Sequence, residues 1–305
     1  MTATAAATFT GGGRGRVRLG RLLGHAEGRF AVALLVAIVL LGLVAPRVLP
    51  YGPTQINARD ALQAPSRAHW FGTDELGRDQ LSRVAAAAPI ALYSATSSVA
   101  VALAVGTTIG LTAGYAGGPS DLALSGVVEV MFSMPALLLA LLVVGVLGPG
   151  LNNALMAVAI VYVPRFARIA RGATLSVRQR EFIEAARATG CSAARIVVEH
   201  VLPNILPSMI VQTALSLSTA EIAQASLSFL GLGVQPPYAD WGNMLAASRA
   251  FVTVAPWLVI FPSVALVLLI IAFNMLGDAL RDVLDPRLRS AVLPRLRGAG
   301  LPGGA

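Results

Sequence analysis

The sequence predicts an all-α polytopic membrane protein with six transmembrane helices, and three observations support this fold class. The chain of 305 residues is 56% hydrophobic and only 12% charged, whereas a soluble domain carries about 25% charged residues. Its apolar residues form repeated runs of roughly 18 residues or more, which are long enough to cross a hydrocarbon core of ~30 Å as helices. These runs are continuously apolar and do not alternate with polar residues, which disfavours a membrane β-barrel.

The N-terminal part predicts a tail, a first span and an outer segment. Residues 1–29 are rich in Ala, Thr, Gly and Arg, which is typical of a flexible cytoplasmic N-terminus. The apolar run 30–49 is closed by Arg47 and two prolines, and no convincing cleavage site follows it. We therefore expect an uncleaved transmembrane helix and not a signal peptide. Residues 50–88 mix Pro, Asp and Arg and predict an extracytoplasmic segment.

Residues 89–281 predict a core of five further transmembrane helices. Gly- and Pro-containing turns such as "GYAGGPSD" and "GPG" separate the apolar runs. The core also contains a polar cytoplasmic loop at 175–202 and an extracytoplasmic loop at 231–256, and residues 282–305 form a cytoplasmic tail. The five expected spans are 89–114, 122–147, 152–173, 203–230 and 257–280.

Arginine placement predicts the orientation. All 23 basic residues are Arg, and 17 of them fall in segments that are cytoplasmic if both termini lie inside. The positive-inside rule therefore supports a multi-pass protein of the cell membrane with both termini in the cytoplasm. The net charge of +8 is explained by this topology and by anionic lipid, because the arginines cluster beside the apolar runs. No nucleic-acid partner is expected.

The polar stretch "EFIEAARATGCSAARIVVEHVLP", residues 181–203, stands out in this apolar chain. Three alanines make its first half a slim helix, and Gly190 is placed to end that helix. A second helix is expected after the turn, with Pro203 ending or kinking it. A slim, capped helix at the membrane surface suits a helix-in-groove contact with a soluble partner. The spacing alone leaves an ordinary surface helix equally open.

The same stretch resembles the EAA loop of ABC importer permeases. The matching positions are Glu184, Ala185, Ala186, Gly190, Leu202 and Pro203, whereas His200 replaces the usual aliphatic residue. Further segments across residues 30–290 resemble the C-type permease subunit of the peptide/nickel group. These segments are "HWFGTDELGRDQLSR", "GYAGGPSD", "LSFLGLGVQPPYADWGNML", "APWLVIFPS" and "NMLGDALRDVLDPRLR".

This resemblance implies a type I ABC importer permease fold with a MetI-like core. It also implies that the EAA helix couples the chain to an ATPase, with Glu184 and Gly190 as its key members. The expected partners are a sister permease in a heterodimer, two ATPase subunits, an extracytoplasmic substrate-binding protein and the lipid membrane. Independently of the family, a standard P-loop needs Lys, and this chain has none. ATP and Mg are therefore expected on the partner ATPases, with no cofactor on this chain.

Polar residues within the spans suggest a translocation path. A charge in hydrocarbon is costly and usually faces a cavity or a partner. Glu129 and Glu221 are candidates to line the path, although each could instead pair with a polar group of the companion permease. Gln224 is a third candidate for the path. Members of this family often carry an acid at that position, and we expect Glu221, one turn earlier on the same face, to take over its polar role. Asp278 is expected to pair with Arg281 across one helical turn.

The outer segments offer further candidates. The resemblance places Pro236 and Trp241 in contact with the binding protein, although the same loop could form a re-entrant plug. His69 and Asp74 have no tight spacing with other ligand residues, so no metal site is expected. Asp74 and Asp79 are instead expected to cap a short helix before the second span. The lone Cys191 excludes an internal disulfide.

A polytopic membrane protein of this kind could be an enzyme or scaffold, a secondary transporter or a permease subunit of an importer. A membrane-embedded enzyme or scaffold would need a polar constellation, and no Ser/His, GxGD or HExxH arrangement is present. A secondary transporter is disfavoured by the absence of an inverted repeat. The expected function is therefore a non-enzymatic permease subunit of an importer for dipeptides or oligopeptides. Nickel chelates or glutathione remain alternative substrates.

Overall fold

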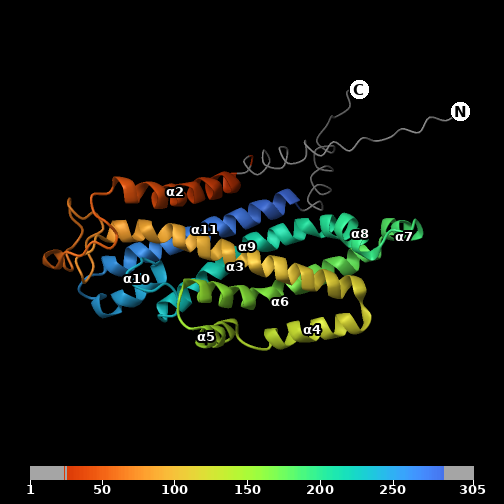
Figure 1. Ribbon diagram of the computed structural model, residues 1–305. Coiled ribbons are helices and arrows are strands. Elements are labelled where there is room, and N and C mark those ends of the chain that lie inside the picture. The colour runs from red at the N-terminus through yellow and green to blue at the C-terminus, as the bar shows by residue number, and fades with distance from the viewer. Residues whose placement is uncertain (1–23, 25, 285–305) are drawn as a thin grey trace, which may run out of the picture.

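The computed structural model describes residues 24 and 26–284, and these residues are mostly α-helical (Figure 1). The predicted all-α class is confirmed. The expected tails at 1–29 and 282–305 fall largely outside the described residues and stay predictions. The α-helices are α2 (Ala26–Val48), α3 (Gln80–Ala116), α4 (Gly118–Phe132), α5 (Ala136–Leu147), α6 (Leu151–Arg178), α7 (Glu181–Ala188), α8 (Ala193–Arg195), α9 (Leu202–Phe229), α10 (Trp241–Ala247) and α11 (Trp257–Leu284).

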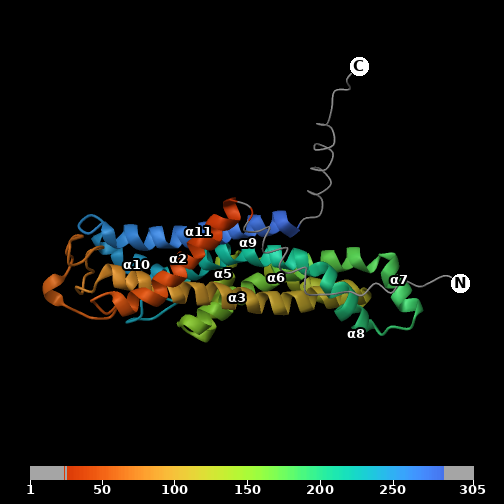
Figure 2. The same cartoon turned by 90° about the horizontal axis from the view of Figure 1, so that it is seen from above.

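The long helices form an elongated bundle. Helices α3, α6, α9 and α11 run along its length, and α2 crosses them obliquely (Figure 2). Helix α10 and the segment before α3 lie at one end of the bundle, and α7 lies at the other end (Figure 1). The arginine distribution predicts that the α7 end is cytoplasmic.

The third expected span, 122–147, is not one straight helix. It is divided into α4 and α5, and the two parts are bent by 95° at the break. Pro135 directly precedes α5 and has no backbone N–H to continue the ladder of α4. Within residues 26–284, five helices are long and apolar enough to cross a membrane, and the number reaches six if the bent pair counts as one span.

Helix α3 begins well before the expected start of the second span at residue 89. Asp79 is its N-cap, because one carboxylate oxygen accepts the backbone N–H of Ser82 at 2.8 Å. The short helix expected before this span is therefore absent, because residues 80–88 belong to α3 itself. Asp74 instead holds a turn, accepting the backbone N–H groups of Leu76 and Arg78 at 3.0 and 2.9 Å.

Three glycines on α3 allow α6 to approach very closely. Gly106, Gly110 and Gly114 are spaced by four residues and face α6. A Cβ added at Gly110 would lie 2.3 Å from the carbonyl oxygen of Ala167. Such a small-residue seam is the usual device for bringing membrane helices together without a hydrophobic driving force. The "GxxxGxxxG" spacing was readable in the sequence, and it was missed.

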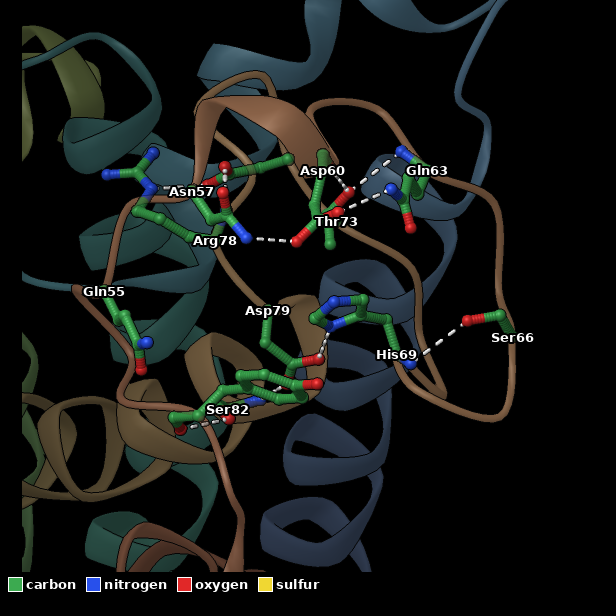
Figure 3. A network of polar contacts seen from close by, with 12 residues as sticks. Gln55, Asn57, Asp60, Gln63, Ser66, His69, Thr73, Arg78, Asp79 and Ser82 are labelled. Carbon is green, nitrogen blue, oxygen red and sulfur yellow. Dashed lines mark hydrogen bonds and ion pairs between the residues drawn. The ribbon is translucent and has the colours of Figure 1, made fainter.

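A polar network orders the segment between α2 and α3 (Figure 3). His69 is buried, and its Nδ1 lies 2.9 Å from a carboxylate oxygen of Asp79, the N-cap of α3. The indole N–H of Trp257 donates to the carbonyl oxygen of Thr73 at 3.2 Å. These contacts fasten the segment to the first turns of both α3 and α11. His69 therefore has a structural partner, and no group of three metal-ligating side chains occurs within residues 26–284.

Candidate functional site

Helix α7 lies at the end of the bundle opposite α10 (Figure 1). Its two buried side chains, Ile183 and Ala186, are three residues apart and belong to the main hydrophobic core. Glu184 and Ala185 are exposed on the other side of the helix. One face of α7 therefore packs on the hydrophobic core, and the opposite face exposes an acidic and a small side chain. Ala186 anchors α7 within this chain, so it is poorly placed to contact a partner.

Gly190 ends α7 through its backbone conformation. Its φ is +80°, and nothing lies within 4 Å of the position that a Cβ would occupy. The N–H of Gly190 donates to the carbonyl of Arg187 at 3.0 Å, and the N–H of Cys191 donates to the carbonyl of Ala186 at 3.1 Å. This pair of bonds is the Schellman arrangement, which needs a left-handed residue after the helix. Glycine is therefore required at position 190 because of its left-handed backbone conformation. A side chain there would not clash with any neighbouring atom.

The sequence predicted that Pro203 would end or kink the helix before the fifth span. The structure shows no break at this residue. Residues 193–229 form one continuous helical stretch in which Ile196–Val201 is a π-helix. Leu202 and Pro203 open α9, where the missing N–H of Pro203 falls within the first turn. Leu202 is half-buried and Pro203 is exposed. Single-turn π segments of this kind are frequent at functional sites.

Glu221 and Gln224 lie on one face of α9 and are each 1% exposed. The side-chain N–H of Gln224 donates to Ser228 and to Asp240, both at 3.2 Å. One oxygen of Glu221 and the amide oxygen of Gln224 have no hydrogen-bond partner among the described residues. Both side chains therefore face α10 across a buried polar cluster.

Asp240 connects this cluster to α10. It is the N-cap of that helix, accepting the backbone N–H of Asn243 at 3.1 Å. Burial raises the pKa of the Asp240 carboxyl, and the hydrogen bonds to it oppose that shift. Asp240 was not among the expected site residues, although its spacing before "WGNM" is an N-cap signal.

Trp241 is 2% exposed, so the expectation that it contacts a binding protein is corrected here. Its indole N–H donates to the carbonyl oxygen of Val84 on α3 at 3.0 Å, because a buried indole needs an acceptor. Pro236 lies in the exposed part of the same loop, beside Tyr238, which is 65% exposed. The accessible aromatic of this loop is therefore Tyr238.

The expected one-turn pair between Asp278 and Arg281 is wrong. The ion pairs formed among residues 26–284 do not include it. Both residues lie on α11 three positions apart, which permits such a pair without requiring it.

Glu129 is exposed on α4 and lines a small pocket of about 90 Å³ together with Arg168 and Arg171 of α6. Arg171 forms a two-point pair with Asp121, with N–O distances of 2.5 and 2.6 Å. The guanidinium of Arg168 lies 3.9 Å from the ring centre of Phe132. Glu129 is thus part of a charged contact between α4 and α6 that the sequence did not predict.

Comparisons with known proteins agree with this architecture. The sequence signature of the family described as "Binding-protein-dependent transport system inner membrane component" matches residues 106–290. The chain is 44% identical over 254 residues to the dipeptide transport system permease protein DppC of Alkalihalophilus pseudofirmus, covering 83% of this chain and 84% of the relative. It is 43% identical over 258 residues to the glutathione transport system permease protein GsiD of Escherichia coli O6:K15:H31, covering 84% and 85%.

A solved structure gives the same result for the fold. A chain from inward-facing conformations of the MetNI methionine ABC transporter is similar with a TM-score of 0.56 and 20% identity. The match covers 67% of this chain and 96% of that chain. At this level of identity the likeness concerns the fold alone.

Proposed function

The chain belongs to the family of binding-protein-dependent transport system inner membrane components, and from this premise we propose that it is a permease subunit of an ATP-driven importer for dipeptides and oligopeptides. The importer-permease fold that its motifs predict is confirmed by the family match and the structural neighbour. The proposed role is to form half of the translocation path.

The observation that supports this role most directly is the arrangement of α7. Ile183 and Ala186 fix the helix to the core, and Gly190 fixes its end, whereas Glu184 stays exposed. A short rigid helix with one anchored face can transmit the movement of a partner to the bundle. In this proposal, α7 enters a groove of an ATPase, and closure of that ATPase pushes on α6 and α9.

The remaining assembly follows from the family. We propose a heterodimer with a sister permease, two ATPase subunits that hold ATP and Mg, and an extracytoplasmic binding protein. The absence of Lys from this chain supports a separate motor, because a standard P-loop needs that residue. The arginine distribution supports a cytoplasmic position for both termini.

A second substrate, glutathione, is supported by the 43% identity to a glutathione permease protein. The dipeptide assignment is preferred because the dipeptide permease protein is similar at 44% identity. Uptake of labelled dipeptide and labelled glutathione by proteoliposomes containing the complete importer separates the two substrates. Uptake of a nickel chelate by the same proteoliposomes tests the third candidate substrate.

The coupling role is tested by Glu184→Arg. Reversing this exposed charge should uncouple ATP hydrolysis from uptake, while the protein stays in the membrane at the normal level. Glu27→Arg is the matched control, because Glu27 is an exposed acid in the first turn of α2, another helix. If Glu184→Arg transported as well as Glu27→Arg, the proposed contact of α7 with an ATPase would be wrong.

A further inference from the structure

A pocket of about 250 Å³ lies beside the break between α4 and α5. Most of its wall is apolar and comes from the residues around the break, including Met131 and Met134. Its polar members come from two other helices, namely Tyr162 and Arg165 of α6 and Thr219 of α9. Residues on both sides of the 95° bend line the pocket.

Arg165 is one of three arginines at intervals of three residues along α6. The other two are satisfied by α4, since Arg171 pairs with Asp121 and Arg168 lies over the ring of Phe132. Arg165 is exposed, and none of the ion pairs formed within residues 26–284 includes it. Its guanidinium lies 5.9 Å from the ring centre of Tyr162, at the edge of cation–π range.

The sequences of α4 and α5 explain why Arg168 and Arg171 have partners whereas Arg165 has none among the described residues. Helix α4 presents polar residues at intervals of four, at Asp121, Ser125 and Glu129, and then ends at Phe132. Helix α5, "ALLLALLVVGVL", has no polar side chain. Arg171 and Arg168 therefore have partners on α4, whereas neither α4 nor α5 offers an acidic partner beside the pocket that Arg165 lines.

Arg165 lies 14 residues after Leu151 and 13 before Arg178, near the middle of α6. An ionisable side chain between apolar helices normally faces a water-filled cavity or a partner. Arg165 has no ion-pair partner among residues 26–284. An anionic ligand in the pocket would supply such a partner.

We propose that Arg165, with Tyr162 and Thr219 beside it, forms a subsite for the terminal carboxylate of a peptide in transit. This inference rests on the proposed function. The guanidinium fork matches a carboxylate in two-point geometry, and the two hydroxyls can add hydrogen bonds. The flexible side chains of Met131 and Met134 provide an adaptable wall for different terminal residues.

The size of the pocket agrees with this assignment. A complete small-molecule site usually occupies about 300–1,000 Å³, whereas this pocket is about 250 Å³. This volume is large enough for the terminal residue of a peptide. Selection among peptides remains with the binding protein, and the subsite selects the charged end.

The test uses the complete importer in proteoliposomes and two probes, alanyl-phenylalanine and its C-terminal amide. The binding protein is first saturated with each probe, as followed by its own fluorescence, so that maximal uptake rates report on the permease. Arg165→Gln should lower the rate for the carboxylate about tenfold, as expected for a lost charge-assisted hydrogen bond. The rate for the amide should stay within about twofold.

Arg168→Gln is the matched control, because it removes a neighbouring arginine from the same face of α6 that does not line this pocket. It should change the rates for both probes by the same factor. Arg165→Lys, which keeps the charge and loses the fork, should retain part of the preference for the carboxylate. The membrane content of each variant should match that of the unmodified importer.

The outcomes separate the two proposals. An equal loss for both probes in Arg165→Gln would overturn the subsite and assign Arg165 to an acid of the sister permease or to a lipid phosphate. An unchanged preference for the carboxylate would also overturn it. If the unmodified importer carries neither probe, the peptide function itself is wrong. Glutathione uptake by the same vesicles then tests the alternative.

Discussion

Replacing Gly110 by alanine tests the closest contact between two helices of this bundle. A Cβ at this position would lie 2.3 Å from the carbonyl oxygen of Ala167 and 2.6 Å from the Cβ of Ala170. Side chains essentially never show a Cβ contact below 3.0 Å. Because the nearest atom belongs to the backbone of α6, it cannot rotate away. The two helices must separate or bend.

The expected magnitude combines two opposing effects. Overpacking of a tight interface costs about 1–3 kcal/mol of unfolding free energy, whereas a glycine-to-alanine change inside a helix gains about 1 kcal/mol. Gly172→Ala isolates the second effect, because nothing lies within 4 Å of a Cβ at Gly172 on α6. Gly110→Ala should therefore be less stable than Gly172→Ala by about 1–3 kcal/mol.

Thermal unfolding of the purified, detergent-solubilised transporter, followed by intrinsic fluorescence, measures this difference. Each kcal/mol shifts the melting temperature by roughly 2–4 °C in a domain of 150–250 residues. Gly126→Ala on α4 is a second control, since its Cβ would also meet open space. If Gly110→Ala melted at or above Gly172→Ala, the close approach of α3 and α6 would be refuted.

Two further predictions concern α7 and α10. Gly190→Ala forces a Cβ into a left-handed conformation at a cost of about 1–2 kcal/mol, so ATP-driven uptake should fall at constant membrane content and recover in Gly190→Asn. Equal impairment of the Asn variant would show that backbone conformation is not the reason. Trp241→Phe removes the bond to the Val84 carbonyl and should lower the unfolding free energy by about 0.5–1.5 kcal/mol. Trp70→Phe is its control, because Trp70 is 68% exposed and should melt unchanged.

The long helices were predictable because they follow from composition. A continuous apolar run can satisfy its backbone in lipid only as a helix or a closed barrel. This rule located the first, fourth, fifth and sixth spans to within five residues of α2, α6, α9 and α11, whereas α3 begins nine residues before the expected second span. The end of α7 at Gly190 was predictable for a local reason, since a left-handed residue is required there.

Other features depend on distant contacts. The sequence shows Pro135 but does not reveal that the helix turns by 95° there, because a proline can also sit in a kinked, continuous helix. The inward position of Trp241 depends on the carbonyl of Val84, which lies 157 residues away in the chain. The sequence alone therefore predicted Trp241 as an exposed contact residue, whereas its side chain is buried.

The sequence by itself determined that this is a helical membrane protein, which residues form the short polar helix α7, and that a standard P-loop is absent. These properties depend on composition, local turn chemistry and residue identity. Only the tertiary structure decided that Gln224 donates to Asp240, and that Arg171 pairs with Asp121 whereas Arg165 faces a pocket. The physical reason is that these arrangements depend on which helix faces which, and on where α4 ends relative to the arginines of α6.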